Sequence, residues 1–360
     1  MSERSPRVRV RHLEHKLGIH GSPTCELVFD DLPAKLIGQR QRGLITYVMA
    51  LMNGARVGIA AQSLGIAEAA YRLGRTYANS RKQFGGPIER LPAVAEMVTD
   101  MKIHLEAARA LTYETSRVCD IENNNTLVLE FQPPTDKDEL KRRKDLSRTL
   151  KRLNGMLTPM AKYYASEMCN RVADTTIQIL GGSGYMRDYP AERYLRDARI
   201  TNIYEGTSQL QVVAAVRGVC SGAFERRVIE FEEINYADEL LNGLKTKLVE
   251  GRMHVLNTIA YVKSQSTDFL DLAGRKLVDA AAAVFIGHLL LQQAAGPVSS
   301  DRATALEQWH TARERKTRVA RRFIEAELPK ARLNCELIAT GDRTPLEEYA
   351  LLAGPVPAKD

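Results

Sequence analysis

Apolar positions recur with a helical period over most of the chain. From Gly43 onward they are spaced three and four residues apart, as in Leu44, Val48 and Leu51, and this spacing predicts a long first helix. The same period predicts further helices at about 92–118, 155–180, 208–220, 230–250, 253–265 running on into 268–295, and 300–340. The sequence therefore predicts a mostly α protein.

Two short segments near the N-terminus alternate instead of following the helical period. Residues 7–15 and 26–30 have the pattern of short strands, and Gly21-Ser22-Pro23 between them predicts a turn. This is the only β-like pattern in the sequence. Two or three strands cannot bury a face alone, so we expect them to pair with strands outside this chain. On this interpretation the chain is N-terminally truncated.

Residues 120–152 differ from the rest in composition. Asn123-Asn124-Asn125 and Pro133-Pro134 predict a polar loop, and the charged residues of 136–152 predict a solvated helix. We interpret this stretch as an insertion between helices.

Composition places the chain among soluble globular proteins. Its 360 residues allow two or three domains, with 44% hydrophobic and 26% charged residues. The 51 Lys and Arg against 44 Asp and Glu give a net charge of +7. We interpret this mild excess of positive charge as favouring solubility. The functional alternative is that it attracts phosphorylated ligands. Basic and aromatic residues do not alternate, so we expect no nucleic-acid surface.

The spacing of the cysteines and histidines does not predict a metal site. The histidines lack metal-ligand spacing, and the cysteines are odd in number and unpaired in spacing: Cys25, Cys119, Cys169, Cys220 and Cys335. Such cysteines are typical of a reduced, cytoplasmic protein. No signal peptide follows Met1, and the apolar stretch from Leu277 to Leu291 is too short to span a bilayer. We therefore expect no transmembrane segment.

A single carboxylate, Glu205, lies on a predicted turn between two helices, after Tyr204 and before Gly206. One isolated carboxylate suits a base that abstracts a proton next to a carbonyl, particularly where burial raises its pKa. Backbone amides around Gly206 are candidates for stabilising the resulting enolate. The alternative is an acidic residue that stabilises a helix N-terminus.

Two more segments suit a phosphorylated or planar ligand. The glycines of Gln178–Tyr185 allow close approach of a ligand, or else form a helix C-cap. This segment is neither a strand-borne G-x-G-x-x-G nor a P-loop. Arg81-Lys82-Gln83-Phe84-Gly85 offers a guanidinium for a pyrophosphate and a ring to cover a ligand, or else a helix C-cap with a hydrophobic anchor.

These three segments, in this order, resemble the acyl-CoA dehydrogenase family over about residues 18–225. The resemblance implies a remnant of a β-domain at 1–35 and the family's four-helix bundle domain at 36–225, with the insertion at about 120–152. Residues 226–360 resemble the extra C-terminal helical bundle of a longer subfamily, similar to 3-methylmercaptopropionyl-CoA dehydrogenase-type enzymes.

The resemblance also implies a function: FAD-dependent α,β-desaturation of an acyl-CoA thioester. By this resemblance Glu205 is the catalytic base. The residues that contact FAD, several of them across a dimer, are Arg81, Gln83, Phe84, Gln178, Gly181, Gly182, Thr207 and Gln209. The substrate-binding residues are Asn53, Arg56, Tyr204 and Gly206.

The resemblance further implies a homodimer or higher homo-oligomer, and an electron-transferring flavoprotein that accepts the electrons. Two alternatives remain open. An acyl-CoA oxidase passes the electrons to oxygen instead. A non-catalytic helical dimerisation fragment uses the bundle only for assembly, and the missing N-terminal domains favour it.

Overall fold

Helices account for most of the structure, as the apolar period predicts. The computed structural model describes residues 7–296 and 312–356, without the side chains of residues 44–46, 49, 50 and 53. Contacts divide the chain into two compact units, one formed by Met1–Thr112 with Ala161–Ser208 and the other by Tyr113–Met160 with Gln209–Asp360. The domain boundaries expected near residues 36 and 226 stay predictions.

A β-hairpin begins the first unit, as predicted. Strands β1 (Val8–Leu13) and β2 (Cys25–Phe29) pair antiparallel, and nearly all their side chains are exposed. The connecting segment is tied to the helical part of this unit by two hydrogen bonds. The Ile19 N–H donates to Asp197 Oδ1 over 2.6 Å, and Arg196 Nη1 donates to the Leu17 carbonyl over 2.9 Å. Between them, a Cβ on Gly18 would lie 2.6 Å from the Arg196 carbonyl oxygen.

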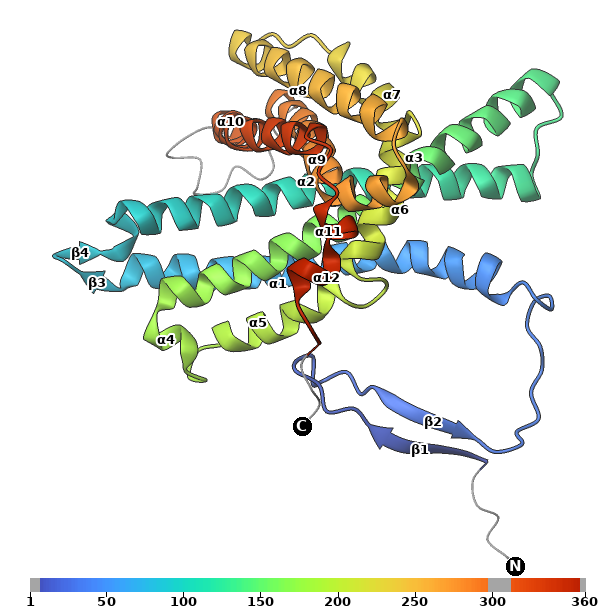
Figure 1. The fold of residues 1–360 in the computed structure, drawn as a ribbon, viewed down its shortest axis with the longest axis horizontal. Helices are drawn as coiled ribbons and strands as arrows, with labels where there is room; N and C mark the ends of the chain where they lie inside the picture. Colours follow the sequence, from blue (N-terminus) through green and yellow to red (C-terminus); the bar gives the residue numbers. More distant parts are fainter. Residues whose placement is uncertain (1–6, 297–311, 357–360) are drawn as a thin grey trace, which may run out of the picture. The chain divides into compact units, whose positions relative to one another are not determined.

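Helices α1 (Met49–Ser80), α2 (Pro92–Phe131) and α3 (Lys137–Leu180) form the main helical layer, and α2 and α3 run through both units (Figure 1). A π-helical turn, η1 (Gly43–Val48), precedes α1. The first unit also holds the short elements η2 (Ile88–Arg90), α4 (Gly182–Tyr185), α5 (Ala191–Arg199) and η3 (Ile200–Asn202).

The core of the first unit brings small residues of α1 against larger ones of α2 and α3. Ala60, Ala67 and Ala70 are fully buried and belong to one cluster with Leu105 and Met168. Small side chains on α1 allow close helix packing, because they leave room for the larger side chains opposite.

The N-terminal hairpin is not the only β structure, contrary to the sequence interpretation. Strands β3 (Lys82–Gln83) and β4 (Gly86–Pro87) pair antiparallel after α1. Phe84 and Gly85 form the two-residue turn, both with positive φ (51° and 87°). A two-residue hairpin turn of this kind requires positive φ at both positions. Strands this short give no alternating pattern in the sequence.

The second unit is helical apart from its loops, in the part of it that the structure describes. Besides parts of α2 and α3 it contains α6 (Ser208–Cys220), α7 (Ala223–Glu232), α8 (Glu239–Lys263), α9 (Thr267–Ala295), α10 (Ala312–Ala339), α11 (Thr344–Glu347) and α12 (Tyr349–Ala353). Asp238 and Ser266 cap the N-termini of α8 and α9 by accepting backbone hydrogen bonds. The predicted helix at 208–220 is confirmed.

Helix α9 is the centre of the second unit. Among the described residues it is the helix long and apolar enough to cross a membrane, but 83% of its most apolar stretch is buried inside the protein. It packs against α8 and α10. Packing inside the protein therefore explains why this helix is so apolar.

The predicted loop at 123–125 is wrong, because α2 continues to Phe131. Asn125 is only 4% exposed, and its Nδ2 donates to the Arg143 carbonyl on α3 over 3.0 Å. This side chain therefore bonds to the neighbouring helix and does not compete with its own backbone. The loop is limited to residues 132–136 around the two prolines. The helix predicted at 136–152 is confirmed, but it continues without a break into the one predicted at 155–180, and together they form α3.

The predicted break between 250 and 253 is also wrong, because α8 is continuous from Glu239 to Lys263. Gly251 does not end the helix. A Cβ there would lie 2.9 Å from Leu328 of α10, so the glycine allows close packing. The break instead falls at residues 264–266, between α8 and α9. The start of the helix predicted at 300–340 lies outside the described residues.

Candidate functional site

Glu205 lies on a strained turn between η3 and α6, as the sequence predicts. Its φ is +53°, and Gly206 follows with φ +92°. A left-handed conformation costs a residue with a side chain roughly 1–2 kcal/mol, so the surrounding structure must hold the turn. The Glu205 side chain is half-buried.

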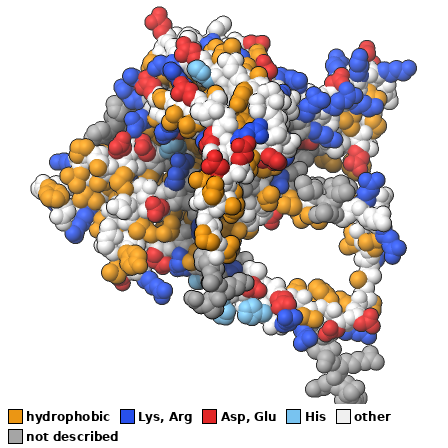
Figure 2. Space-filling model, viewed as in Figure 1, with side chains coloured by type: hydrophobic (Ala, Val, Ile, Leu, Met, Phe, Trp, Pro, Cys, Tyr) orange, Lys and Arg blue, Asp and Glu red, His pale blue; other side chains and the backbone are white. Residues whose placement is uncertain are grey.

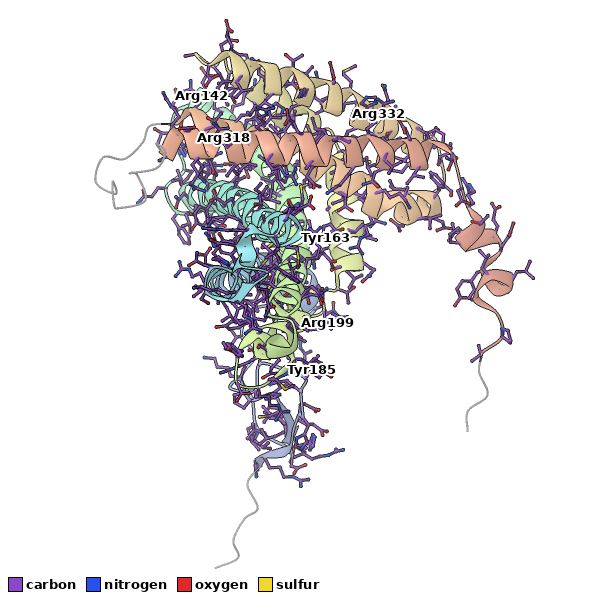
Figure 3. All side chains as sticks on the ribbon, turned by 90° about the vertical axis from the view of Figure 1, so that its left-hand side faces the viewer. Arg142, Tyr163, Tyr185, Arg199, Arg318 and Arg332 are labelled. Atoms are coloured by element: carbon purple, nitrogen blue, oxygen red, sulfur yellow. The ribbon has the colours of Figure 1, made fainter. Side chains whose placement is uncertain are left out.

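A buried lysine on α3 holds this turn. Lys162 is fully buried, and its Nζ donates to the Gly206 carbonyl over 2.8 Å. Burial lowers the pKa of Lys162 to about 8, and the charge of Arg56 acts in the same direction against the opposing effects of Glu167 and Glu205. Figure 3 labels Tyr163, the next residue along α3.

Arg56 on α1 contributes a second cation. It is half-buried, and burial lowers its pKa while the negative charge of Glu205 opposes that shift. The carboxylate of Glu205 therefore interacts with two cations, Arg56 and Lys162, from two different helices. The structure brings the predicted residues Arg56 and Glu205 together.

Both ends of the turn are also tied to helices. Before Glu205, the Tyr204 hydroxyl donates to Gln62 Oε1 on α1, and burial raises the pKa of Tyr204. After it, the Ser208 hydroxyl donates to Glu167 Oε1 on α3. Asn202 Nδ2 donates to the same oxygen over 3.3 Å. These bonds fix the approach of the chain to Glu205 from either side.

The sequence also predicts site roles for Thr207, Gln209 and Asn53. Thr207 is half-buried between Gly206 and α6. Gln209 is exposed on the first turn of α6 and belongs to the second unit. The side chain of Asn53 lies outside the described residues.

A second group of predicted residues gathers at the far ends of α1 and α3. Arg81, Gln83 and Phe84 lie on the β3–β4 hairpin, and all are exposed, with Phe84 90% exposed. Gln178 and the two glycines lie where α3 ends. The Tyr77 hydroxyl donates to Ser183 Oγ over 3.3 Å, which joins the end of α1 to the glycine segment. Figure 3 labels Tyr185 at the end of that segment.

The glycines in this group have distinct roles. Gly181 ends α3 with φ +59°, and its N–H donates to the Ile177 carbonyl over 2.9 Å, so it is a helix C-cap. A Cβ on Gly181 or Gly182 would meet nothing within 4 Å, which leaves open space over this backbone. A Cβ on Gly184 would lie 2.6 Å from the Ile177 carbonyl oxygen, so that glycine serves packing.

The two groups are far apart within the unit. Arg81 follows Arg56 by about 38 Å along α1, at 1.5 Å per residue. Gln178 follows Lys162 by about 24 Å along α3 on the same basis. The described residues of the first unit therefore present two separate sets of candidate residues. In the described ranges, no three His, Cys, Asp or Glu side chains are placed to hold a metal ion.

Sequence reasoning missed three residues of the Glu205 site: Lys162, Glu167 and Gln62. Lys162 does carry a signal, since it interrupts the apolar run from Met156 to Ala165 at a core position. A lysine there is either paired or functional. Glu167 and Gln62 follow ordinary helical patterns and carry no such signal.

Comparison with protein families matches two adjacent regions of the chain. The family "Acyl-CoA dehydrogenase, C-terminal domain" matches residues 42–130 and 142–219, and "Acyl-CoA dehydrogenase C terminal" matches residues 220–307. The gap between the first two ranges falls within the stretch interpreted as an insertion.

Individual relatives of the chain are also named acyl-CoA dehydrogenases. The chain is 39% identical to an acyl-CoA dehydrogenase of Bacillus subtilis, over 59% of this chain and 48% of the relative. It is 37% identical to a short-chain specific acyl-CoA dehydrogenase of Clostridium acetobutylicum, over 55% of this chain and 45% of the relative. The chain thus spans about half the length of the curated relatives it matches.

A solved structure shares the fold. An acyl-CoA dehydrogenase of Bacillus anthracis, solved with FAD, superposes with a TM-score of 0.72 over 98% of this chain and 61% of that one, at 21% identity.

Proposed function

Because the chain belongs to the acyl-CoA dehydrogenase family through residues 42–307, we propose that it takes part in FAD-dependent α,β-desaturation of an acyl-CoA thioester. The observation that carries this proposal is the Glu205 turn. It presents one carboxylate, next to a glycine, and is held by a buried lysine and by hydrogen bonds on both sides.

In this proposal Glu205 removes a proton from the carbon next to the thioester carbonyl. The positive φ of Glu205 and Gly206 turns the chain out of the helical path at the carboxylate. Arg56 and Lys162 bring positive charge to the same place. When bound, FAD supplies the acceptor for the hydride that leaves the adjacent carbon. Tyr204 and Arg56 contact the substrate.

The second group of residues fits FAD. Arg81 is an exposed guanidinium suited to a phosphate, Phe84 is an exposed ring, and the backbone at Gly181 and Gly182 has open space. Gln83 and Gln178 extend the same surface.

The separation of the two groups supports a homo-oligomer. A site at Glu205 that uses Arg81, Phe84 and Gln178 must take them from a second copy, because they are far from it in the same copy. We propose a homodimer or higher homo-oligomer in the cytoplasm, with an electron-transferring flavoprotein as electron acceptor. A relative 35% identical to the chain is named as a subunit of a caffeyl-CoA reductase–Etf complex.

Reconstitution of the 360-residue chain with FAD tests the proposal. We expect a flavin spectrum near one FAD per chain, and reduction of the flavin on addition of butyryl-CoA. Glu205→Gln should keep the flavin and lose nearly all reduction, whereas Glu130→Gln, an exposed acid on α2, should behave as wild type.

Other outcomes decide between the alternatives. A chain that retains no flavin but forms a stable dimer is an assembly module, which contradicts the proposal. Peroxide formed in step with substrate loss identifies an acyl-CoA oxidase. Normal flavin reduction by Glu205→Gln would place the base elsewhere.

A further inference from the structure

A pocket of about 240 Å³ lies in the second unit, and none of the residues assigned above lines it. It is enclosed by the part of α2 after residue 113, the first part of α3, and the beginning of α7 (Figure 1). Its apolar lining consists of Val118, Ile121, Leu146, Leu150, Leu153 and Ala223. The pocket therefore offers an apolar surface to a ligand.

The rim of this pocket is strongly basic. Arg117, Arg152, Arg226 and Arg227 line it, against a single acid, Glu230. Guanidinium groups that the neighbouring acids do not balance would attract an anion to this pocket. Figure 2 shows Lys and Arg side chains gathered over the projecting ends of α2 and α3.

Two of the four arginines are already neutralised within the unit. Glu114 accepts hydrogen bonds from both Arg117 and Arg227, at 2.8 and 2.9 Å. Burial acts to raise the pKa of Glu114, but these two partners outweigh it and the pKa is lowered. Arg227 also pairs with Glu230.

The other two, Arg152 and Arg226, are exposed and have no ion pair with any residue that the structure describes. They come from different helices, α3 and α7. Positive charge on this rim therefore exceeds what the neighbouring acids balance.

A helix terminus also favours an anion here. Helix α7 begins at the pocket, after Gly222 with φ +86°, and Ala223 lines it. The first N–H groups of a helix and its dipole attract negative charge.

We propose that this pocket binds a small amphipathic anion, with a carboxylate head group between Arg152 and Arg226 and a short apolar tail against the α2 and α3 side chains. The volume sets the size of the tail, because pockets for drug-sized ligands measure about 300–1,000 Å³. A whole coenzyme A thioester is too large. The site is therefore separate from the proposed acyl-CoA site and independent of the proposed function.

Calorimetric titration of the full chain with octanoate tests the proposal. We expect saturable binding of one octanoate per chain, and about tenfold weaker binding for 1-octanol, which has the tail but no charge. Arg152→Gln and Arg226→Gln should each weaken octanoate binding about tenfold. Leu146→Glu, which brings a negative charge to the apolar wall at a partly exposed position, should abolish it.

Two control variants make similar changes outside the pocket lining. Lys151→Gln removes a positive charge next to Arg152 but off the lining, and Leu127→Glu changes an exposed leucine of α2 outside the pocket. Both should bind octanoate as wild type does. The proposal is overturned if wild type binds no octanoate, if octanol binds equally well, or if Arg152→Gln, Arg226→Gln and Leu146→Glu all bind normally while retaining wild-type circular dichroism.

Discussion

The ammonium of Lys162 donates a hydrogen bond to the carbonyl oxygen of Gly206 over 2.8 Å, from a fully buried position on α3. The residue before Gly206 is the proposed base. Lys162 is therefore a positioning residue: it acts on Glu205 through the backbone of the turn and through its charge. Two predictions depend on it.

Lys162→Met keeps the length of the side chain but removes both the donor and the charge. We expect tenfold or greater loss of flavin reduction by acyl-CoA, because the strained turn loses its anchor. Hydrogen exchange of residues 203–208 should become faster. Exchange as slow as in wild type would show that the turn holds without Lys162.

Lys162 also predicts a pH dependence of stability. Its pKa is about 8 in the folded protein and about 10.5 when unfolded, so between these values the unfolded chain binds more protons. The free energy of unfolding of wild type, relative to Lys162→Met, should rise with pH in this window by up to about 1.4 kcal/mol per pH unit. Denaturant titrations at pH 7.5, 9 and 10.5 measure it. A constant difference would mean that Lys162 titrates normally.

His288 on α9 predicts an acid-sensitive core. The imidazole is fully buried, and neither ring nitrogen has a hydrogen-bond partner among the described residues. Burial lowers its pKa to about 3, with help from Arg252 and Lys245, while Glu232 lies 3.9 Å away and is itself paired with Arg252. The unfolded chain takes up a proton below pH 6.5 and the folded chain does not.

His288→Leu should therefore raise the free energy of unfolding by about 1–3 kcal/mol at pH 7. The advantage over wild type should grow by up to about 1.4 kcal/mol per pH unit as the pH falls from 6.5 toward 3. His254→Leu, at an exposed position on α8, is the control. Equal acid sensitivity of His288→Leu and wild type would contradict the assignment.

Gly218 on α6 predicts a steric effect. A Cβ there would lie 2.7 Å from Met156 Cα on α3, and backbone cannot move aside as a flexible side chain can. Gly218→Ala should destabilise the protein by about 1–3 kcal/mol. Gly243→Ala on α8, where a Cβ meets nothing within 4 Å, should instead stabilise by about 0.5–1 kcal/mol. Thermal melts of both variants test the pair, and a common direction of change would refute it.

Arg81 predicts a loss of cofactor affinity. Under the proposed function its guanidinium binds a phosphate of FAD, so Arg81→Ala should weaken FAD binding by about 2 kcal/mol, or roughly thirtyfold. Lys82→Ala removes an equally exposed charge one residue later and should have a small effect. Equilibrium dialysis with FAD measures both. Equal losses would indicate general attraction of the anion and no specific contact.

The helical fold and the N-terminal hairpin followed from periodicity and turn residues alone. The errors came where one contact decides the outcome. Asn125 is a poor helix former, yet it is helical because its amide bonds to Arg143 of another helix, which no local pattern records. Gly251 lies in the predicted break between 250 and 253, yet it is a packing residue inside a continuous helix.

Some residues of the site could likewise be predicted from the sequence, and others could not. Glu205, Gly206 and Arg56 were accessible from local chemistry and from the family resemblance. Lys162 was overlooked because its role depends on a carbonyl that the fold brings to it from the far side of a turn. The assigned FAD and substrate roles stay predictions, as does the long subfamily suggested by residues 226–360.

Gly18 lets the segment that connects the strands of the N-terminal hairpin lie directly against α5. The two strands expose nearly all their side chains, and the hydrogen bonds that tie the connecting segment to α5 come from Leu17 and Ile19, around a residue with no room for a methyl group. A larger residue at position 18 would therefore push the hairpin away from α5, while the exposed side chains of Val10 and Leu27 stay available for contact with another surface.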